Sequence, residues 1–268
     1  MEKRAFLKTA VKAARLAGDY LLDNLGKVSK KDITLKQASD FVTRVDMGSE
    51  EIILSTIKKD FPDHMFLTEE SVHDNDTEHY RWIIDPLDGT TNFIHCYPVF
   101  SVSIALQYRR EIILGVIYEP LRDELFSAEK AKGAFRNRQR IRVSASGSFK
   151  DCLITTGFPF RSKEMIDPYL KLFKNVFLKV SDLRRAGSAA MDLANLACGR
   201  CDAFFEIGLR PWDIAAGSIL ITEAGGIITD FNGGHAFLQS GNIVAGNPMA
   251  HKKLLREVKE VFRGIIAA

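Results

Sequence analysis

Two amphipathic helices are predicted at the start of the chain. Between residues 4 and 25, apolar positions recur every three or four residues, the period of a helix with one buried face. These positions are Phe6, Leu7, Ala10, Ala14, Ala17 and Leu21. A short strand is expected at 33–36. The segment Thr43-Arg44-Val45-Asp46 then resembles a capping box in which Asp replaces the usual Glu. It would open a second helix that continues to Phe61.

The remainder of the chain shows two different patterns of strands. Short apolar or alternating runs separated by turns predict a largely antiparallel sheet, with strands at 65–67, 81–84, 99–107, 112–118 and 124–128 and a hairpin over 132–143. Further on, strands alternate with helices. Strands are expected at 153–156, 181–183, 203–206, 227–229 and 243–245, and helices at 169–177, 189–197, 214–224 and 249–264. Such alternation is typical of an α/β sheet covered on both faces.

Together these elements predict a layered αβαβα sandwich that combines α+β and α/β character. We expect residues 1–268 to form a single catalytic unit, in which 1–144 is a half of helices plus antiparallel sheet and 145–268 is an α/β half. The joint falls in the small-residue stretch from Ser144 to Ser148. The sequence contains neither an internal repeat nor a low-complexity segment.

The segment from Trp82 to Phe93 carries the strongest chemical signal. Its apolar start predicts a buried strand, which leads directly into Asp85-Pro86-Leu87-Asp88-Gly89-Thr90-Thr91. Two carboxylates are therefore delivered to one sheet edge, Gly89 permits a sharp turn, and Thr90-Thr91 can start a helix. Acids next to free N–H groups at a helix start favour a site for a divalent metal and a phosphate together. A plain strand, turn and helix cap would not explain the second acid.

Other acids lie at strand ends or helix starts. Glu69-Glu70 follows an apolar run, Asp213 opens a helix rich in Ala and Gly, and Asp46 lies in the first turn of the second helix. Taken singly, Asp213 can be a plain N-cap, Asp46 only a capping-box acid, and Glu70 only a helix-start acid. Five carboxylates would share one pocket if the fold gathered Glu69, Asp85, Asp88, Asp213 and Asp46. Such a cluster is unfavourable without cations, and hard divalent ions, Mg²⁺ above all, suit its oxygen ligands.

Composition narrows the classes of function. With 46% hydrophobic and 26% charged residues the chain is an ordinary soluble protein, and a net charge of +3 makes nucleic-acid binding unlikely. No apolar run reaches the length of a membrane span, and the N-terminus lacks the apolar core of a signal peptide. The four cysteines include one lone C-x-x-C, from Cys198 to Cys201, so we expect a reduced cytoplasmic protein without membrane attachment.

Several common enzyme classes are disfavoured by missing motifs. The six histidines show no metal-ligand spacing, which argues against a zinc hydrolase. The sequence has no Walker A loop, no G-x-G-x-x-G after a strand and no G-x-S-x-G. Oxygen ligands to a hard cation are therefore the chemistry that the sequence favours.

At two places the sequence resembles the signatures of a known family. The stretches Asp85–Asn92 and Trp212-Asp213-Ile214-Ala215-Ala216-Gly217 are similar to the paired motifs of inositol monophosphatases, which are Mg²⁺-dependent, lithium-sensitive phosphatases with an αβαβα sandwich. Further matches occur in order along nearly the whole chain. They are Lys36, residues 42–46, Glu69-Glu70-Ser71, Gly187-Ser188-Ala189-Ala190, Glu206 and residues 222–226. Because the family is commonly dimeric, the resemblance implies a homodimer.

The resemblance also implies a role for each matching residue. One Mg²⁺ would be held by Glu69, Asp85 and the carbonyl of Leu87, and a second by Asp85, Asp88 and Asp213, with a third plausible beside Glu69. Thr90, paired with Asp46, would orient or deprotonate the attacking water, and Glu70 is counted with these catalytic residues. Phosphate oxygens would be held by the amides of Gly89, Thr90 and Thr91. The polyol part of the substrate would lie among Gly187, Ser188, Ala189 and Glu206.

The leading hypothesis is therefore a Mg²⁺-dependent phosphatase that hydrolyses inositol-1-phosphate, a small phosphate monoester. Fructose-1,6-bisphosphatase activity, alone or in addition, is the nearest alternative, and Arg210 supports it as a cation that could bind a second phosphate, although it could also serve a dimer contact. Other phosphatases of the superfamily act on 3′-phosphoadenosine 5′-phosphate or histidinol phosphate. A different class of function is binding to the transcription machinery, as in some bacterial relatives, with residual phosphatase activity.

Overall fold

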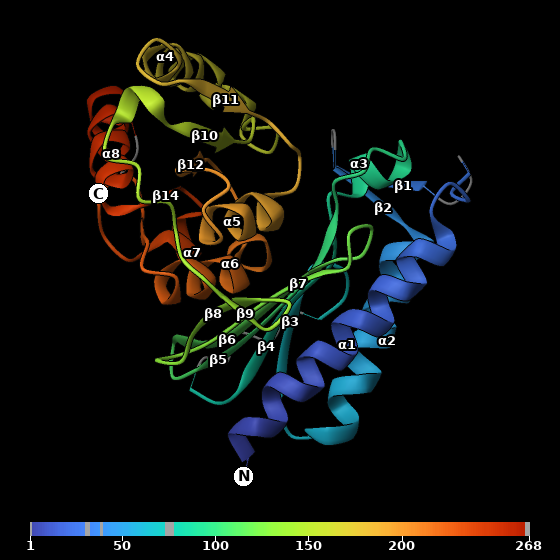
Figure 1. Cartoon of the computed structure of the whole chain (residues 1–268). Coiled ribbons are helices and arrows are strands. Elements are labelled where there is room, and N and C mark those ends of the chain that lie inside the picture. The colour runs from blue at the N-terminus through green and yellow to red at the C-terminus, as the bar shows by residue number, and fades with distance from the viewer. Residues whose placement is uncertain (1, 30–32, 38–39, 73–77, 266–268) are drawn as a thin grey trace.

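Five layers of secondary structure are stacked in the order helix, sheet, helix, sheet, helix (Figure 1). The computed structural model describes residues 2–29, 33–37, 40–72 and 78–265. Each of the two sheets in this stack has helices on both faces, as expected for strands whose residues are buried on both sides. The predicted αβαβα sandwich is confirmed.

The first layer consists of α1 (Glu2–Asn24) and α2 (Arg44–Asp60), whose apolar faces pack on the larger sheet. Between them, β1 (Ile33–Gln37) and β2 (Asp40–Thr43) form a two-stranded antiparallel sheet. Thr43 is the N-cap of α2, and its capping box with Asp46 is present. The capping box predicted from the sequence is therefore confirmed, with Asp in place of Glu.

The larger sheet has seven strands in sequence order. They are β3 (Met65–Thr68), β4 (Arg81–Asp88), β5 (Ser101–Tyr108), β6 (Glu111–Glu119), β7 (Glu124–Glu129), β8 (Gly133–Arg136) and β9 (Gln139–Ile141). All neighbours are antiparallel except β3 and β4, which are parallel. On β4, Trp82 and Ile84 join the core under α1 and α2, whereas Ile83 faces the opposite core. This alternation assigns the two faces of the sheet.

The smaller sheet has five strands in the order β11-β10-β12-β14-β13. Their bounds are Leu153–Thr156 for β10, Asp182–Arg184 for β11, Ala203–Glu206 for β12, Ile227–Thr229 for β13 and Ile243–Gly246 for β14. Only the pairs that β10 makes with β11 and β12 are parallel. Its outer face carries α4 (Ile166–Phe177) and α8 (Pro248–Phe262). Its inner face carries α5 (Ala189–Ala197) and α6 (Pro211–Glu223).

The remaining helices are short. They are α3 (Thr90–Ile94), α7 (Phe237–Ser240) and two 3₁₀ turns at Phe149–Asp151 and Lys163–Met165. Within the described residues, we find no helix with the length and apolar character needed to cross a bilayer.

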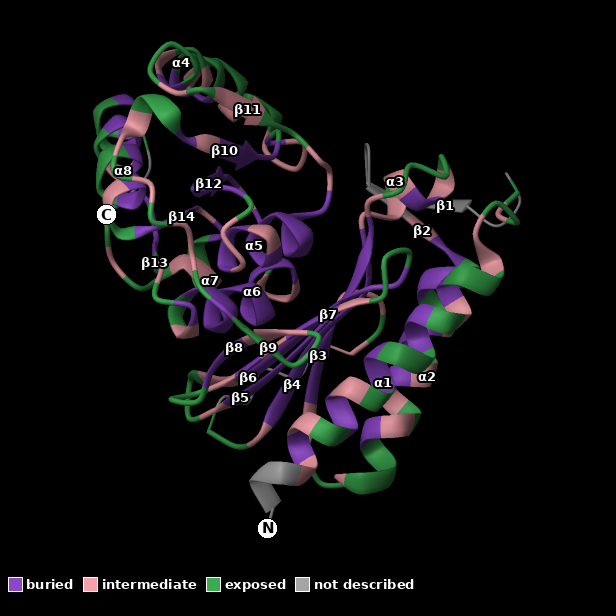
Figure 2. Cartoon of the chain, viewed as in Figure 1, coloured by how far each residue is buried: buried purple, intermediate pink, exposed green. Residues whose placement is uncertain are grey.

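The middle layer, α5 and α6, is buried against both sheets (Figure 2). Close approach of α6 to the larger sheet depends on Gly115 of β6. A Cβ at this position would lie 2.6 Å from the backbone oxygen of Ala216 and 2.7 Å from Ile219 Cγ2. Because the backbone of α6 cannot yield as a flexible side chain could, Gly115 sets the distance between this sheet and the helix that begins near Asp213.

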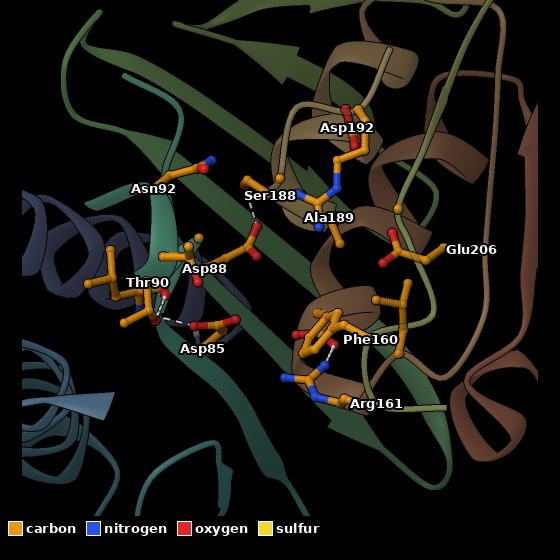
Figure 3. Close-up of a pocket in the computed structure, with 18 of the residues that line it drawn as sticks. Asp85, Asp88, Thr90, Asn92, Phe160, Arg161, Ser188, Ala189, Asp192 and Glu206 are labelled. Carbon is orange, nitrogen blue, oxygen red and sulfur yellow. Dashed lines mark hydrogen bonds and ion pairs between the residues drawn. The ribbon is translucent and has the colours of Figure 1, made fainter. Parts of the chain in front are cut away.

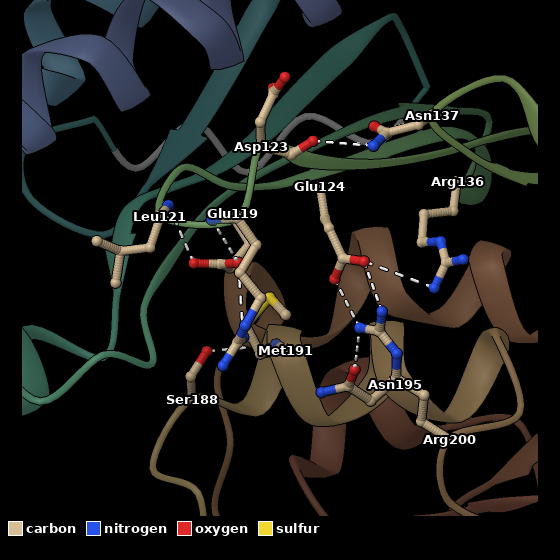
Figure 4. A network of polar contacts seen from close by, with 11 residues as sticks. Glu119, Leu121, Asp123, Glu124, Arg136, Asn137, Ser188, Met191, Asn195 and Arg200 are labelled. Carbon is tan, nitrogen blue, oxygen red and sulfur yellow. Dashed lines mark hydrogen bonds and ion pairs between the residues drawn. The ribbon is translucent and has the colours of Figure 1, made fainter.

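A polar contact also joins the two halves at their surface. Arg200, after α5, donates two hydrogen bonds to the carboxylate of Glu124 at the start of β7, and Asn195 accepts a third at 3.0 Å (Figure 4). The hydrogen bonds from Arg200 lower the pKa of Glu124. Arg136 lies 3.5 Å from the same carboxylate. A bidentate contact between an arginine and a carboxylate fixes the relative orientation of the two groups as well as the distance between them.

Substitution of Gly115 by Ala is expected to lower the free energy of unfolding by about 1–3 kcal/mol, because an added methyl group forces α6 away from β6. Urea unfolding monitored by circular dichroism measures this change. Gly147→Ala is the matched control, since nothing lies within 4 Å of a Cβ built on Gly147. Equal stabilities of the two variants would contradict the close packing described here.

Candidate active site

A cavity of about 410 Å³ opens where β4, the starts of α5 and α6 and the end of β12 converge (Figure 3). Its walls come from both sheets and from the helices between them, so neither half of the chain could form it alone. Most of the predicted site residues line it.

The end of β4 delivers the central acids of the cavity. The strand continues through Asp88 rather than ending at Ile84 as predicted, and its pairing with β5 is irregular between Asp85 and Asp88. That irregularity accommodates the residues between the acids, where the amide of Leu87 donates to Asp85 Oδ1 at 3.0 Å. Gly89 follows with a φ of 95°, and a Cβ there would lie 3.0 Å from the carbonyl oxygen of Val99. Only glycine adopts this turn without strain.

Three carboxylates converge in the cavity. Asp85, Asp88 and Asp213 each offer an oxygen, all within 4.8 Å of one another, and all three side chains are buried. Burial, followed by the charges of Glu69, Asp88 and Asp213, raises the pKa of Asp85 well above its usual range. Burial and the neighbouring Asp213 raise the pKa of Asp88 to about 6. Buried oxygen ligands that repel one another fit a hard divalent cation, which would remove the repulsion.

Hydrogen bonds hold two of these acids in place. Asp88 Oδ2 accepts the hydroxyl of Ser188 and the amide of Ala190, the latter at 2.8 Å. Asp213 Oδ2 accepts the amide of Arg210 at 2.7 Å. Arg210 is thus the N-cap residue of α6 and Asp213 the third residue of the helix, so the alternative that Asp213 is an N-cap was wrong. The short bond from Ser188 to Asp88 ties the start of α5 to the end of β4.

Thr90 lies beside the acids, at the start of α3. Its hydroxyl oxygen is 2.8 Å from Asp46 Oδ1 and 3.1 Å from the carbonyl oxygen of Leu87. The other oxygen of Asp46 accepts the amide of Thr43 at 2.8 Å. Burial raises the pKa of Asp46. Asp46 therefore caps α2 and accepts a hydrogen bond from Thr90 at the same time, so it is not only a capping-box acid. Its role with Thr90 in orienting or deprotonating water stays a prediction.

A guanidinium group approaches the acids from the side of the smaller sheet. Arg161 Nη1 lies 3.2 Å from Asp213 Oδ2, and Nη2 lies 3.7 Å from Glu69 Oε1 (Figure 3). The guanidinium also stacks over the ring of Phe160, with 4.6 Å to its centroid. Arg161 was not predicted as a site residue, because it lies in a loop after β10 where no pattern marks it. It offsets part of the negative charge at the edge of the cluster.

The other predicted residues differ in their placement. Gly187, Ser188, Ala189 and Glu206 line the cavity, as do Glu69, Leu87, Gly89, Thr90 and Thr91. Glu70 does not line it; its amide donates to Glu50 Oε2 at 3.0 Å, and a catalytic role for its side chain stays a prediction. Arg210 lines a neighbouring cavity of about 770 Å³, which shares Arg161 with the first.

Asn92, Arg185 and Asp192 are among the further cavity residues to which the sequence analysis assigned no role. Asn92 donates to the carbonyl oxygens of Val99 at 2.7 Å and Ala186 at 3.0 Å, which joins α3 to the segment before α5. Asp192 and Arg185 also line the cavity. The sequence does mark Asp192, because it is the one acid in the segment 189–194, which otherwise contains only apolar or small residues.

Comparisons with known proteins agree on the family of this chain. The model of the inositol monophosphatase family matches residues 2–263. The chain is 46% identical to Nus factor SuhB of Salmonella typhimurium over 255 residues, which are 95% of this chain and 96% of that protein.

Solved structures give the same result. The crystal structure of extragenic suppressor protein suhB from Bartonella henselae is 44% identical, with a TM-score of 0.91 over 96% of this chain and 99% of that one. The structure of inositol monophosphatase from Anabaena (Nostoc) is 39% identical, with a TM-score of 0.87 over 97% of each chain.

Stabilisation of the protein by Mg²⁺ is expected to grow as the pH rises. The raised pKa values of Asp85 and Asp88 mean that the metal-free fold favours their protonated forms. The contribution of Asp88 to stability is complete below the ordinary aspartate pKa of about 4 and is lost as the pH rises through about 6. The contribution of Asp85, whose pKa is also raised, is likewise lost as the pH rises. Mg²⁺ instead requires deprotonated carboxylates.

Thermal unfolding with and without Mg²⁺, at about pH 5 and about pH 7.5, measures this difference. The rise in Tm should be larger at the higher pH. Asp88→Asn, which removes one titrating ligand, should shrink both the rise and its dependence on pH. A rise in Tm that is equal at the two pH values would contradict the assignment of these acids as a cation site.

Proposed function

The chain belongs to the inositol monophosphatase family, and on this premise we propose that it is a Mg²⁺-dependent phosphatase that hydrolyses myo-inositol-1-phosphate to inositol and phosphate. The observation that carries the proposal is the convergence of Asp85, Asp88 and Asp213 on one cavity with Thr90 beside them. The whole chain is proposed to act as one catalytic unit, because residues on both sides of the joint at residue 144 line that cavity.

The metal ligands that we propose share one carboxylate. Glu69, Asp85 and the carbonyl of Leu87 would hold one Mg²⁺, and Asp85, Asp88 and Asp213 a second, with a third beside Glu69. All of these residues contribute oxygen atoms, as Mg²⁺ prefers. The chemistry that such ions supply when bound is neutralisation of phosphate charge and activation of a water molecule.

Thr90 and Asp46 are proposed to position that water. The Thr90 hydroxyl donates toward Asp46 Oδ1 at 2.8 Å, which leaves the threonine oxygen able to accept a hydrogen bond from water. As the water oxygen attacks phosphorus, its proton passes by way of Thr90 to Asp46. Because burial raises the pKa of Asp46, it is a better proton acceptor than an exposed aspartate. The bond from phosphorus to the alcohol oxygen breaks, and that oxygen takes a proton from solvent.

The first residues of α3 supply donors for the phosphate oxygens. Amides in the first turn of a helix have no acceptor within the helix, so those of Gly89, Thr90 and Thr91 are available for this purpose. Donors fixed in advance stabilise the charge that develops on the phosphate during transfer. Gly187, Ser188, Ala189 and Glu206 line the same cavity and are proposed to surround the polyol.

Phosphate release from a panel of substrates tests this proposal. With Mg²⁺ we expect the fastest release from myo-inositol-1-phosphate and slower release from fructose-1,6-bisphosphate, 3′-phosphoadenosine 5′-phosphate and histidinol phosphate, with inhibition by lithium. Asp88→Asn should lower kcat by about 100-fold or more while circular dichroism shows an intact fold. Near-normal turnover by this variant would contradict the metal site. Fastest release from the bisphosphate would favour the alternative, for which Arg210 in the adjoining cavity is the supporting observation.

A second candidate function is binding to the transcription machinery. It is favoured by the name Nus factor SuhB, which relatives at 46% identity bear. Retention of RNA polymerase and its elongation factors on the immobilised chain at physiological salt would support it, and Asp88→Asn should not alter that retention. No retained protein would count against it. We also propose a cytoplasmic homodimer. The expectation that nucleic-acid binding is unlikely has no support from relatives that bear the name Nus factor.

A further inference from the structure

The first half of α2 carries three buried polar residues on one face. Asp46 precedes Ser49 by three residues and Glu50 by four, which is the spacing of neighbours on a helix surface. Their exposed fractions are 1%, 0% and 2%. Further along the helix, the buried positions Ile53 and Ile57 are apolar. Because buried polar groups need hydrogen-bond partners, the contacts of these three side chains show what this part of α2 holds.

Ser49 bonds to the end of β4. Its hydroxyl donates to the carbonyl oxygen of Pro86 at 2.7 Å. A serine within a helix commonly bonds to a carbonyl of its own helix, as Ser55 does at 3.1 Å. The hydroxyl of Ser49 instead leaves α2 and reaches the segment 85–88, where the pairing of β4 with β5 is irregular. It therefore fixes the backbone between two acids of the cavity.

Glu50 bonds to the turn that follows β3. Its Oε2 accepts the amide of Glu70 at 3.0 Å, and its Oε1 accepts the hydroxyl of Ser71. The amide of Glu69 donates to the carbonyl oxygen of Ile84 at 3.2 Å. The backbone at Glu69 is thus fixed by β4 on one side and by Glu50 on the other, and the residue itself lines the cavity.

We propose that Glu50 and Ser49 are positioning residues that align the proposed Mg²⁺ ligands on two separate segments of the chain. Glu50 sets the turn that carries Glu69, and Ser49 sets the backbone between Asp85 and Asp88. The inference rests on the proposed phosphatase function and deepens it. Groups that hold metal ligands in place typically contribute 10–100-fold to metal affinity or activity.

One rigid helix thereby joins three segments of the site. Asp46, on the same face of α2, accepts the hydroxyl of Thr90 at 2.8 Å. The three side chains thus bond to the turn after β3, the end of β4 and the start of α3. A helix keeps its side chains at fixed spacings, so α2 sets the positions of these segments relative to one another.

A purely structural role explains Glu50 less well. It lies beyond the first turn of α2, where the helix dipole no longer stabilises an acid. A buried charge also costs desolvation energy that an apolar side chain, such as those of Ile53 and Ile57, does not. The packing of α2 therefore does not require an acid at this position, whereas the amide of Glu70 and the hydroxyl of Ser71 do.

Calorimetric titration with Mg²⁺ alone tests the proposal without turnover. Glu50→Gln keeps the size of the side chain but replaces one acceptor oxygen by an amide group that cannot accept. The Mg²⁺ dissociation constant of this variant should rise about tenfold or more. Ser49→Ala, which removes one hydrogen bond, should raise it about threefold to tenfold. Glu51→Gln and Ser55→Ala are the matched controls, exposed on the same helix, and should change it by less than about twofold.

Ser71→Ala keeps the test decisive if Glu50→Gln does not fold. Ser71 is exposed, so this variant should keep a Tm near that of the wild type while its Mg²⁺ dissociation constant rises about threefold. Because both changes break the same contact, the double variant with Glu50→Gln should bind Mg²⁺ less than about twofold more weakly than Glu50→Gln alone.

Phosphate release from myo-inositol-1-phosphate gives a second measurement. For Glu50→Gln, the Mg²⁺ concentration that gives half-maximal release should rise by the same factor as the dissociation constant. The kcat at saturating Mg²⁺ should fall by a smaller factor, because excess metal restores the occupied site.

The outcomes separate this inference from the proposed function. A lower Tm of Glu50→Gln with an unchanged Mg²⁺ dissociation constant would indicate a structural role and overturn the inference. Equal rises for Glu50→Gln and Glu51→Gln would indicate an effect of net charge and overturn it as well. Absence of phosphate release by the wild type from every ester would contradict the proposed function, and the calorimetric comparison would still decide the role of Glu50.

Discussion

The site depends on holding Asp85, Asp88 and Asp213 close together in a buried space, although their carboxylates repel one another. Charges a few ångströms apart repel strongly where water does not screen them, so the fold must hold these side chains together against their own electrostatics. The raised pKa values of Asp85 and Asp88 express that cost. A divalent cation would offset this repulsion, so the same cluster that is unfavourable in the metal-free protein suits a metal ion.

The acids are held close together by elements that are distant from one another in the sequence. Ser188 and the amide of Ala190 bond to Asp88, the amide of Arg210 bonds to Asp213, and each of these donors stands at the start of a helix between the two sheets. Gly115 lets that helix layer approach the larger sheet, and the contact of Arg200 with Glu124 fixes the surface between the halves. The acids are thus placed by the packing of the middle layer and not by the strand-end motif alone.

Much of this arrangement could be predicted from local patterns. The local signals are the alternation on β4, the capping box at Thr43 and the two acidic segments. The layered fold and the acid cluster were predicted from signals of this kind. The end of β4 was misplaced because the irregular pairing that carries Asp85 to Asp88 is set by β5. Arg161 and Arg185 were missed because loops bring them to the cavity, and only tertiary structure shows which loops meet. The position of Arg210 as the N-cap likewise depends on Pro211, which begins α6 one turn earlier than predicted.

The cavity combines two ways of compensating buried negative charge. Near β4, acids converge closely enough to share a metal ion, and Arg161 offsets the charge at the edge. Near β12, Asp192 and Glu206 lie outside that cluster and have neither a donor nor a paired cation from the described chain. Burial raises the pKa of both acids well above its usual range, so protonation can compensate for their negative charge. A divalent cation therefore fits the first region, and such an ion would draw a bound phosphate toward Asp85 and Asp88.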